Sequence, residues 1–176
     1  MFKLKVILSL ILSLFFVSNS FSKDNVKDKE ALYKTVAEFN DAITKKNYKI
    51  FADSISNKFI EEMAKEIHLD KVNLKDSLAE RISNQVKKTS NPIYKMDGKK
   101  AVFNQTKSGL FYALIPLHVE GNDFTKESVN LAVLEKGKWS FIYGGPSLYQ
   151  SPLFLKIYPE LTNMPLEPEK IDNRKK

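Results

Sequence analysis

The first half of the chain carries apolar residues at the three- and four-residue spacing that places them on one face of an α-helix. Leu32, Val36, Phe39 and Ile43 follow this spacing, and Asp28 precedes them as a candidate N-cap. The pattern therefore predicts a first amphipathic helix whose apolar face packs against the rest of the protein.

Two more helices are predicted after a short helical turn at 47–51. One spans about 57–68, and its apolar stripe consists of Phe59, Ile60, Met63 and Ile67. The other spans about 74–88, and Asn73 is its candidate N-cap because a side-chain amide oxygen can accept from a free backbone N–H there.

The second half changes to short apolar runs separated by turn residues, which is the pattern of an antiparallel β-meander. The expected strands span 93–96, 101–106, 110–120, 128–134 and 139–143. Asp97-Gly98 predicts a tight hairpin, because both residues tolerate a positive φ. Pro116 cannot donate to a ladder, so it predicts that the longest strand lies at an edge or is bulged there.

The C-terminal part predicts a short helix that begins at Pro152 with Ser151 as its cap. Residues 167–176 are expected to form a loose charged tail. Helices followed by a curved meander predict a single α+β domain over 23–166, with the helices on one face of the sheet.

Residues 1–22 have the three-part layout of a secretory signal peptide. Lys3 and Lys5 precede the apolar run 6–17, which is too short to span a bilayer, and small residues follow it. We expect cleavage after Ser20 or Ser22, no membrane span after cleavage, and a location in the periplasm or outside the cell. No cysteine follows the run, which excludes a lipid anchor on an N-terminal Cys.

Composition removes several classes of chemistry. The chain has no cysteine, which excludes thiol catalysis, thiolate metal sites and disulfides. Its formal charge of +7 falls to +5 once Lys3 and Lys5 are removed with the signal. Only Arg81 and Arg174 among its 28 basic residues are arginines, the residue best suited to bidentate recognition of guanine and phosphate. We therefore expect no nucleic-acid partner.

His118 and Glu120 are the candidate catalytic residues. They lie two positions apart on the longest expected strand and so share one of its faces. A histidine oriented by a carboxylate is an arrangement used for general-base catalysis. The opposite face, from Phe111 to Val119, is wholly apolar and is the one expected to meet the helices, so His118 is expected to point outward.

Four aromatic residues are candidates for binding a ligand or for filling the core. Trp139, Phe141 and Tyr143 share one face of the last expected strand, and Tyr112 lies on the longest one. Aromatic side chains of this kind serve either as packed core or as the lining of a pocket. Neither a metal site nor a cofactor is expected, because the two histidines are far apart in the sequence and no phosphate-binding loop is present.

The order of elements resembles the NTF2-like, cystatin-like cone, in which a bent sheet wraps a long helix. The segment 131–141, with its Gly137-Lys-Trp139 turn, is similar to the paired last strands of that superfamily. Together with 112–116 and 158–160, it also resembles a group of exported bacterial proteins. The superfamily contains isomerases, dehydratases, carrier modules and immunity proteins, so the resemblance implies a fold but no single activity.

The sequence favours a non-enzymatic ligand- or protein-binding module of the cell envelope. Its partner would be a small hydrophobic ligand held inside the cone, or an envelope protein docked on the sheet. One alternative is an immunity protein against an envelope-acting toxin. Others are a small acid–base enzyme of the isomerase or dehydratase kind, and a structural envelope component that forms a homodimer through an open sheet face.

Overall fold

A computed structural model of the chain describes residues 21–88 and 92–173. The predicted signal segment lies outside the described residues, except for Phe21 and Ser22, which open the first helix. None of the helices in the described ranges is both long and apolar enough to cross a bilayer.

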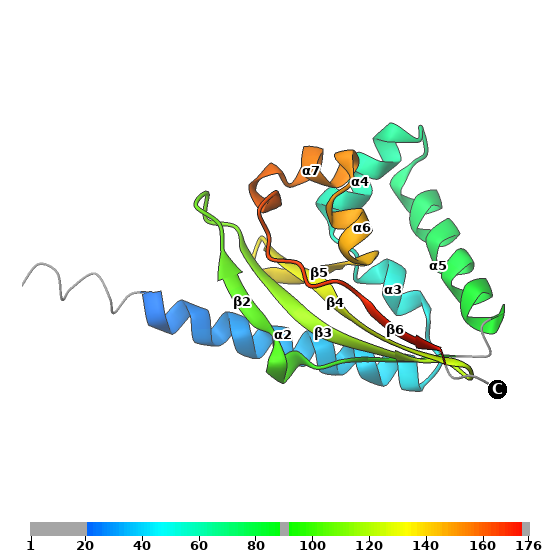
Figure 1. Cartoon of the computed structure of the whole chain (residues 1–176). Helices are drawn as coiled ribbons and strands as arrows, with labels where there is room; N and C mark the ends of the chain where they lie inside the picture. Colours follow the sequence, from blue (N-terminus) through cyan, green and yellow to red (C-terminus); the bar gives the residue numbers. More distant parts are fainter. Residues whose placement is uncertain (1–20, 89–91, 174–176) are drawn as a thin grey trace, which may run out of the picture.

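Within these described ranges, six strands form one antiparallel sheet that curls into a half-barrel (Figure 1). Its centre is the pair β3 (Phe111–Glu120) and β4 (Phe124–Glu135). Two short strands follow one another along the outer edge of β3, and two along the outer edge of β4. These are β1 (Ile93–Met96) and β2 (Val102–Gln105) beside β3, and β5 (Lys138–Ile142) and β6 (Lys170–Asn173) beside β4.

The long helix α2 (Phe21–Thr44) packs on one face of this sheet (Figure 1). Its predicted apolar face is confirmed, because Leu32, Val36, Phe39 and Ile43 are all buried. The short helix α3 (Lys49–Asp53) adds Phe51 to the same core cluster. The protein therefore has an α+β fold in which a long helix packs on one side of a bent sheet. This arrangement is consistent with an NTF2-like fold.

A second layer of helices covers the other face, so the expectation of helices on one face only is wrong. The layer contains α4 (Asn57–Glu66), α6 (Gly145–Tyr149) and α7 (Pro152–Ile157), and α5 (Lys71–Lys88) packs beside α3 and α4. The cause lies in β4, which is apolar at four consecutive positions, 131–134. Successive strand residues point to opposite faces, so both faces need an apolar cover.

The expected hairpin at Asp97-Gly98 does not form. β1 and β2 both pair with β3 instead of with each other. The Asp97 side chain accepts from the backbone N–H of Lys100, which shapes a 3-10 turn at Gly98–Lys100 between the two strands. The turn makes β1 and β2 two halves of one interrupted edge.

That interruption lies opposite Pro116. The Pro116 carbonyl accepts a hydrogen bond from Asp97 N at 2.9 Å. The nitrogen and the carbonyl of one strand residue point to the same side, so the Pro116 nitrogen, which has no hydrogen to donate, also faces the interrupted edge. The prediction of an edge strand is wrong, since β3 has neighbours on both sides. The alternative, a bulge in β3 at Pro116, is also wrong, because the register of β3 on β4 runs unbroken through Pro116. The irregularity lies in the neighbouring edge, between β1 and β2.

Helix starts were predicted less well than helix faces. α2 begins at Phe21, so Asp28 is not its cap, and the Asp28 carbonyl accepts from Trp139 Nε1 at 2.7 Å. The cap of α5 is Asp70, which accepts from Val72 N and Asn73 N. In α4, Phe59 and Ile60 are buried as expected, whereas Ile67 is exposed just beyond the helix end.

The C-terminal part agrees with the prediction at α7 and differs after it. Ser151 Oγ accepts from Phe154 N at 3.2 Å, which confirms the predicted cap. Residues 170–173 of the expected loose tail form β6. This strand pairs with 124–127 of β4. The shorter β5 pairs with 131–135 of β4 and does not reach that stretch.

Candidate functional site

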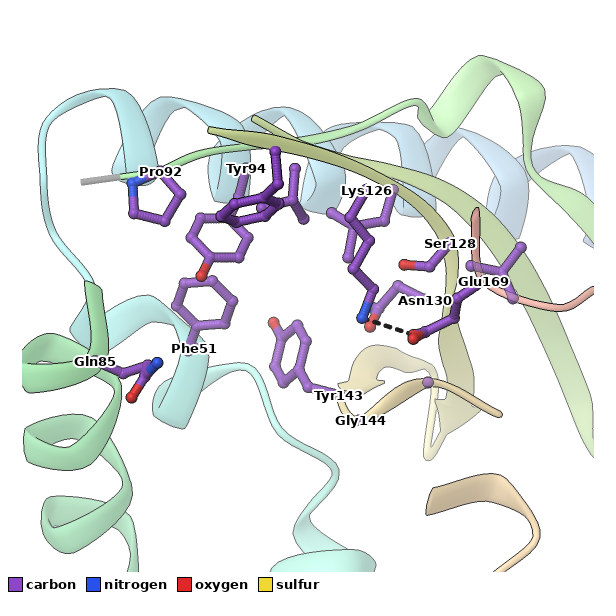
Figure 2. Close-up of a pocket in the computed structure, with 15 residues that line it drawn as sticks. Phe51, Gln85, Pro92, Tyr94, Lys126, Ser128, Asn130, Tyr143, Gly144 and Glu169 are labelled. Carbon is purple, nitrogen blue, oxygen red and sulfur yellow. Dashed lines mark ion pairs between the residues drawn. The ribbon is translucent and has the colours of Figure 1, made fainter. Parts of the chain in front are cut away.

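A cavity of about 330 Å³ lies on the α2 face of the sheet, beyond the end of the packed core. We call this cavity the main pocket. Its walls come from β1, β3 and β4, from α3 and α5, and from the turn that follows β5 (Figure 2). The apolar part of its lining consists of Phe51, Pro92, Tyr94, Leu117, Val119, Phe124, Val129 and Tyr143.

The strand β4 explains why the pocket is empty of core side chains. On the α2 face, its residues change from Ala132 to Asn130, Ser128 and Lys126 toward the start of the strand. The opposing residues of β3 stay apolar, with Leu117 opposite Ser128. The result is a pocket with aromatic side chains on one side and polar groups on the other (Figure 2).

Lys126 and Glu169 form an ion pair on the polar side. The Lys126 Nζ atom lies 2.7 Å from Glu169 Oε1, and the two side chains are 31% and 28% exposed. They are the two charged residues among the described residues that line the main pocket. Glu169 comes from the segment just before β6, so the end of the chain completes the pocket wall.

Asn130 is the most deeply buried polar residue of the lining, with only 2% of its surface exposed. Its amide nitrogen contacts the Met96 sulfur at 3.9 Å, which is a weak hydrogen bond. Ser128 lies beside it, with its hydroxyl turned toward the hollow (Figure 2). These two side chains offer donors and acceptors to a ligand that reaches the polar side.

The aromatic side is held rigidly. The rings of Tyr94 and Tyr143 lie 5.3 and 5.1 Å from that of Phe51, in edge-on contacts. Tyr143 OH donates to Ser54 Oγ at 2.6 Å, since the Ser54 proton is used on the Ile50 carbonyl. Burial raises the pKa of the Tyr143 phenol well above its usual range and also raises the pKa of Tyr94. Both groups are therefore neutral phenols at physiological pH.

The candidate catalytic pair lies outside this pocket. His118 is on the opposite face of β3, where its Nδ1 lies 2.5 Å from Glu127 Oε1 and its Nε2 4.0 Å from Glu120 Oε2. The side chain of His118 is 37% exposed. The structure thus brings His118 and Glu120 together at the surface, and neither residue lines the main pocket.

The four aromatic candidates separate into core and lining. Trp139 and Phe141 are buried under α2, and Tyr112 is buried under the second helical layer. Tyr143, at the end of the same face as Trp139 and Phe141, is the one of the four that lines the main pocket. Tyr143 follows β5 directly and stacks on Phe39 of α2 with ring centroids 6.0 Å apart, so it closes the core on one side and lines the main pocket on the other.

A second hollow, of about 650 Å³, lies beside the β4–β5 turn. Glu135 and Tyr158 of its lining join the buried Ser56 in a hydrogen-bond network, which sequence reasoning missed. Ser56 Oγ and Tyr158 OH donate to the two oxygens of Glu135 at 2.9 and 2.7 Å, and they lie 2.6 Å from each other. Because these groups satisfy one another, the network fastens α4, β4 and α7 together and leaves little for a ligand.

Lys126, Ser128, Asn130 and Glu169 were also missed as site residues. The alternation along β4 contained a signal for three of them, since Lys126, Ser128 and Asn130 share the face of the apolar Ala132. Nothing local pointed to Glu169. Within the described ranges, no three His, Asp or Glu side chains gather in a way that could hold a metal ion.

The chain was also compared with known proteins. No family model, no curated protein and no solved structure matches it.

Proposed function

We propose that the protein is a non-enzymatic binding module of the cell envelope and that its main pocket holds a small, mainly apolar molecule. The observation that carries the proposal is the pocket itself, a cavity of about 330 Å³ with an aromatic side and a short row of polar groups. Ligand sites in proteins commonly combine apolar walls with a few orienting polar groups in a cavity of this size.

The chemistry of the lining favours binding over catalysis. The carboxylate of the main pocket belongs to Glu169, and it is held by Lys126 at 2.7 Å. The two phenols of Tyr94 and Tyr143 keep their protons because burial raises their pKa. An ion-paired carboxylate and two neutral phenols are suited to orienting a ligand.

The test is a fluorescence titration with N-phenyl-1-naphthylamine, an uncharged apolar probe that becomes bright when it leaves water. We expect saturable binding to the wild-type protein. Ser128→Phe fills the hollow and should weaken binding by about tenfold or more. Glu127→Phe places the same ring on the opposite face of the same strand and should bind as the wild type does.

Equal binding to wild type and Ser128→Phe would refute the main pocket as the site. Circular dichroism of both variants checks that each one folds.

We also propose that the protein is an NTF2-like member that is exported and processed. The supporting observations are the bent sheet with its long helix and the signal-like segment 1–22. The mass of the protein recovered from its own cells tests the processing. A chain that begins at Phe21 or Lys23 is expected, and a chain that begins at Met1 would contradict it.

A further inference from the structure

The ion pair of the main pocket constrains the charge of any ligand that touches it. Lys126 and Glu169 are both less than one third exposed, at 31% and 28%. Charged groups at such positions lose much of their hydration and depend on their partner. A ligand with a charged head must therefore leave each of the two with an opposite charge nearby.

A ligand with a single charge fails this requirement. A carboxylate that binds Lys126 would sit beside Glu169, with which it shares its sign. An amine that binds Glu169 would meet the same repulsion from Lys126. Like charges at contact distance in a partly dry site oppose binding.

A ligand that carries both a positive and a negative charge can leave Lys126 and Glu169 each with an opposite charge nearby. Its carboxylate can bind Lys126 while its ammonium binds Glu169, so that one internal pair is replaced by two charge-assisted pairs. Asn130 and Ser128 lie on the same side of the pocket (Figure 2). An amide and a hydroxyl supply both donors and acceptors, which suits a head group that needs both.

The remainder of the pocket fits an apolar body of limited size. The rings of Phe51, Tyr94 and Tyr143 face the polar side across the hollow (Figure 2). The volume of about 330 Å³ is at the small end of the range for ligand sites. We infer that the ligand is a free α-amino acid with an apolar side chain. This inference rests on the proposed function and specifies its ligand class.

Isothermal titration calorimetry with three matched compounds tests the inference. L-phenylalanine carries both charges, 3-phenylpropanoate only the carboxylate, and 2-phenylethylamine only the ammonium. We expect L-phenylalanine to bind about tenfold or more tightly than either analogue. Lys126→Gln and Glu169→Gln should each weaken its binding by a similar factor. Lys170→Gln, a neighbouring exposed lysine outside the lining, should leave binding unchanged.

N-phenyl-1-naphthylamine separates this inference from the proposed function. The double variant Lys126→Gln/Glu169→Gln should still bind that uncharged probe, which shows that the pocket is intact. The amino-acid inference is overturned if either singly charged analogue binds the wild type as tightly as L-phenylalanine does. It is also overturned if none of the three compounds binds while the probe does. In both cases the proposed function stands. If the probe also fails to bind, both are overturned.

Discussion

Lys126 on β4 and Glu169 just before β6 are joined by a 2.7 Å ion pair on the wall of the main pocket. The Glu169 carboxylate also lies against the Gly145 backbone, in the space that a side chain at position 145 would occupy. A Cβ atom built on Gly145 would collide with Glu169 Oε1. The turn after β5, the segment before β6 and the pocket wall are therefore in direct contact, which leads to a first prediction about stability.

Gly145→Ala should lower the free energy of unfolding by more than the strain of its positive φ alone would cause. Its φ of +66° disfavours any side chain, and the new methyl would also displace Glu169. We expect a loss of about 2 kcal/mol or more in the free energy of unfolding, measured in urea. Gly109→Ala is the matched control, with φ +92° and no atom within 4 Å of the new Cβ. Equal losses in the two variants would contradict the collision with Glu169.

Ser56→Ala tests the network beside the β4–β5 turn. Ser56 caps α4 as Ser151 caps α7, each accepting from the backbone N–H three residues on. Ser56 Oγ also donates to Glu135 and lies 2.6 Å from Tyr158 OH, so its loss removes one of the donors to the half-buried Glu135 carboxylate and leaves a gap beside the buried Tyr158. We expect Ser56→Ala to cost at least about 1 kcal/mol more than Ser151→Ala in urea unfolding. Indistinguishable costs would mean that the network adds nothing to the cap.

Stability should fall steeply in alkali. Burial raises the pKa of Tyr143, Tyr149 and Tyr158 above the usual value of about 10. The folded protein then keeps three protons that the unfolded chain releases above about pH 10, so unfolding becomes easier as the pH rises. The expected slope approaches about 1.4 kcal/mol per pH unit for each tyrosine.

Urea midpoints between about pH 9 and pH 11 measure this dependence. Tyr149→Phe and Tyr158→Phe should each make the slope shallower by the contribution of one proton. A wild-type stability that stays constant over this interval would show that the three phenols are not held in their neutral form.

Lys136→Asn should stabilise the β4–β5 turn. Lys136 has φ +52° next to Gly137 at +75°, a left-handed pair that favours asparagine and glycine. We expect a gain of about 0.5 kcal/mol in thermal or urea unfolding. Lys107→Asn, in the turn before Gly109 and without a positive φ, is the control and should give no gain. A loss of stability at Lys136 would contradict the turn geometry.

Local sequence patterns predicted most helices and strands. They did not predict which strands pair with one another in the sheet. The buried face of α2 and the Ser151 cap depend on residues a few positions apart. The hairpin at Asp97-Gly98 was wrong because β1 and β2 both find a better partner in β3, a choice made by distant residues.

The candidate site was predictable only in part, for the same reason. Tyr143 was a candidate from its place in the aromatic stripe, and it does line the main pocket. Whether Trp139 and Phe141 lined a pocket or filled the core depended on how α2 packs on the sheet, and both are buried in the cluster that α2 forms with it. Glu169 was predicted to lie in a loose tail, and the pairing of β6 with β4 brings it to Lys126.

The most direct test of the central claim is a map of backbone amide NMR shifts during titration with N-phenyl-1-naphthylamine. We predict that the largest shifts fall on Tyr94, Ser128, Asn130 and Tyr143, which line the main pocket. Shifts centred on Lys58, Glu135 and Lys136 at the second hollow, or spread evenly over the protein, would contradict it.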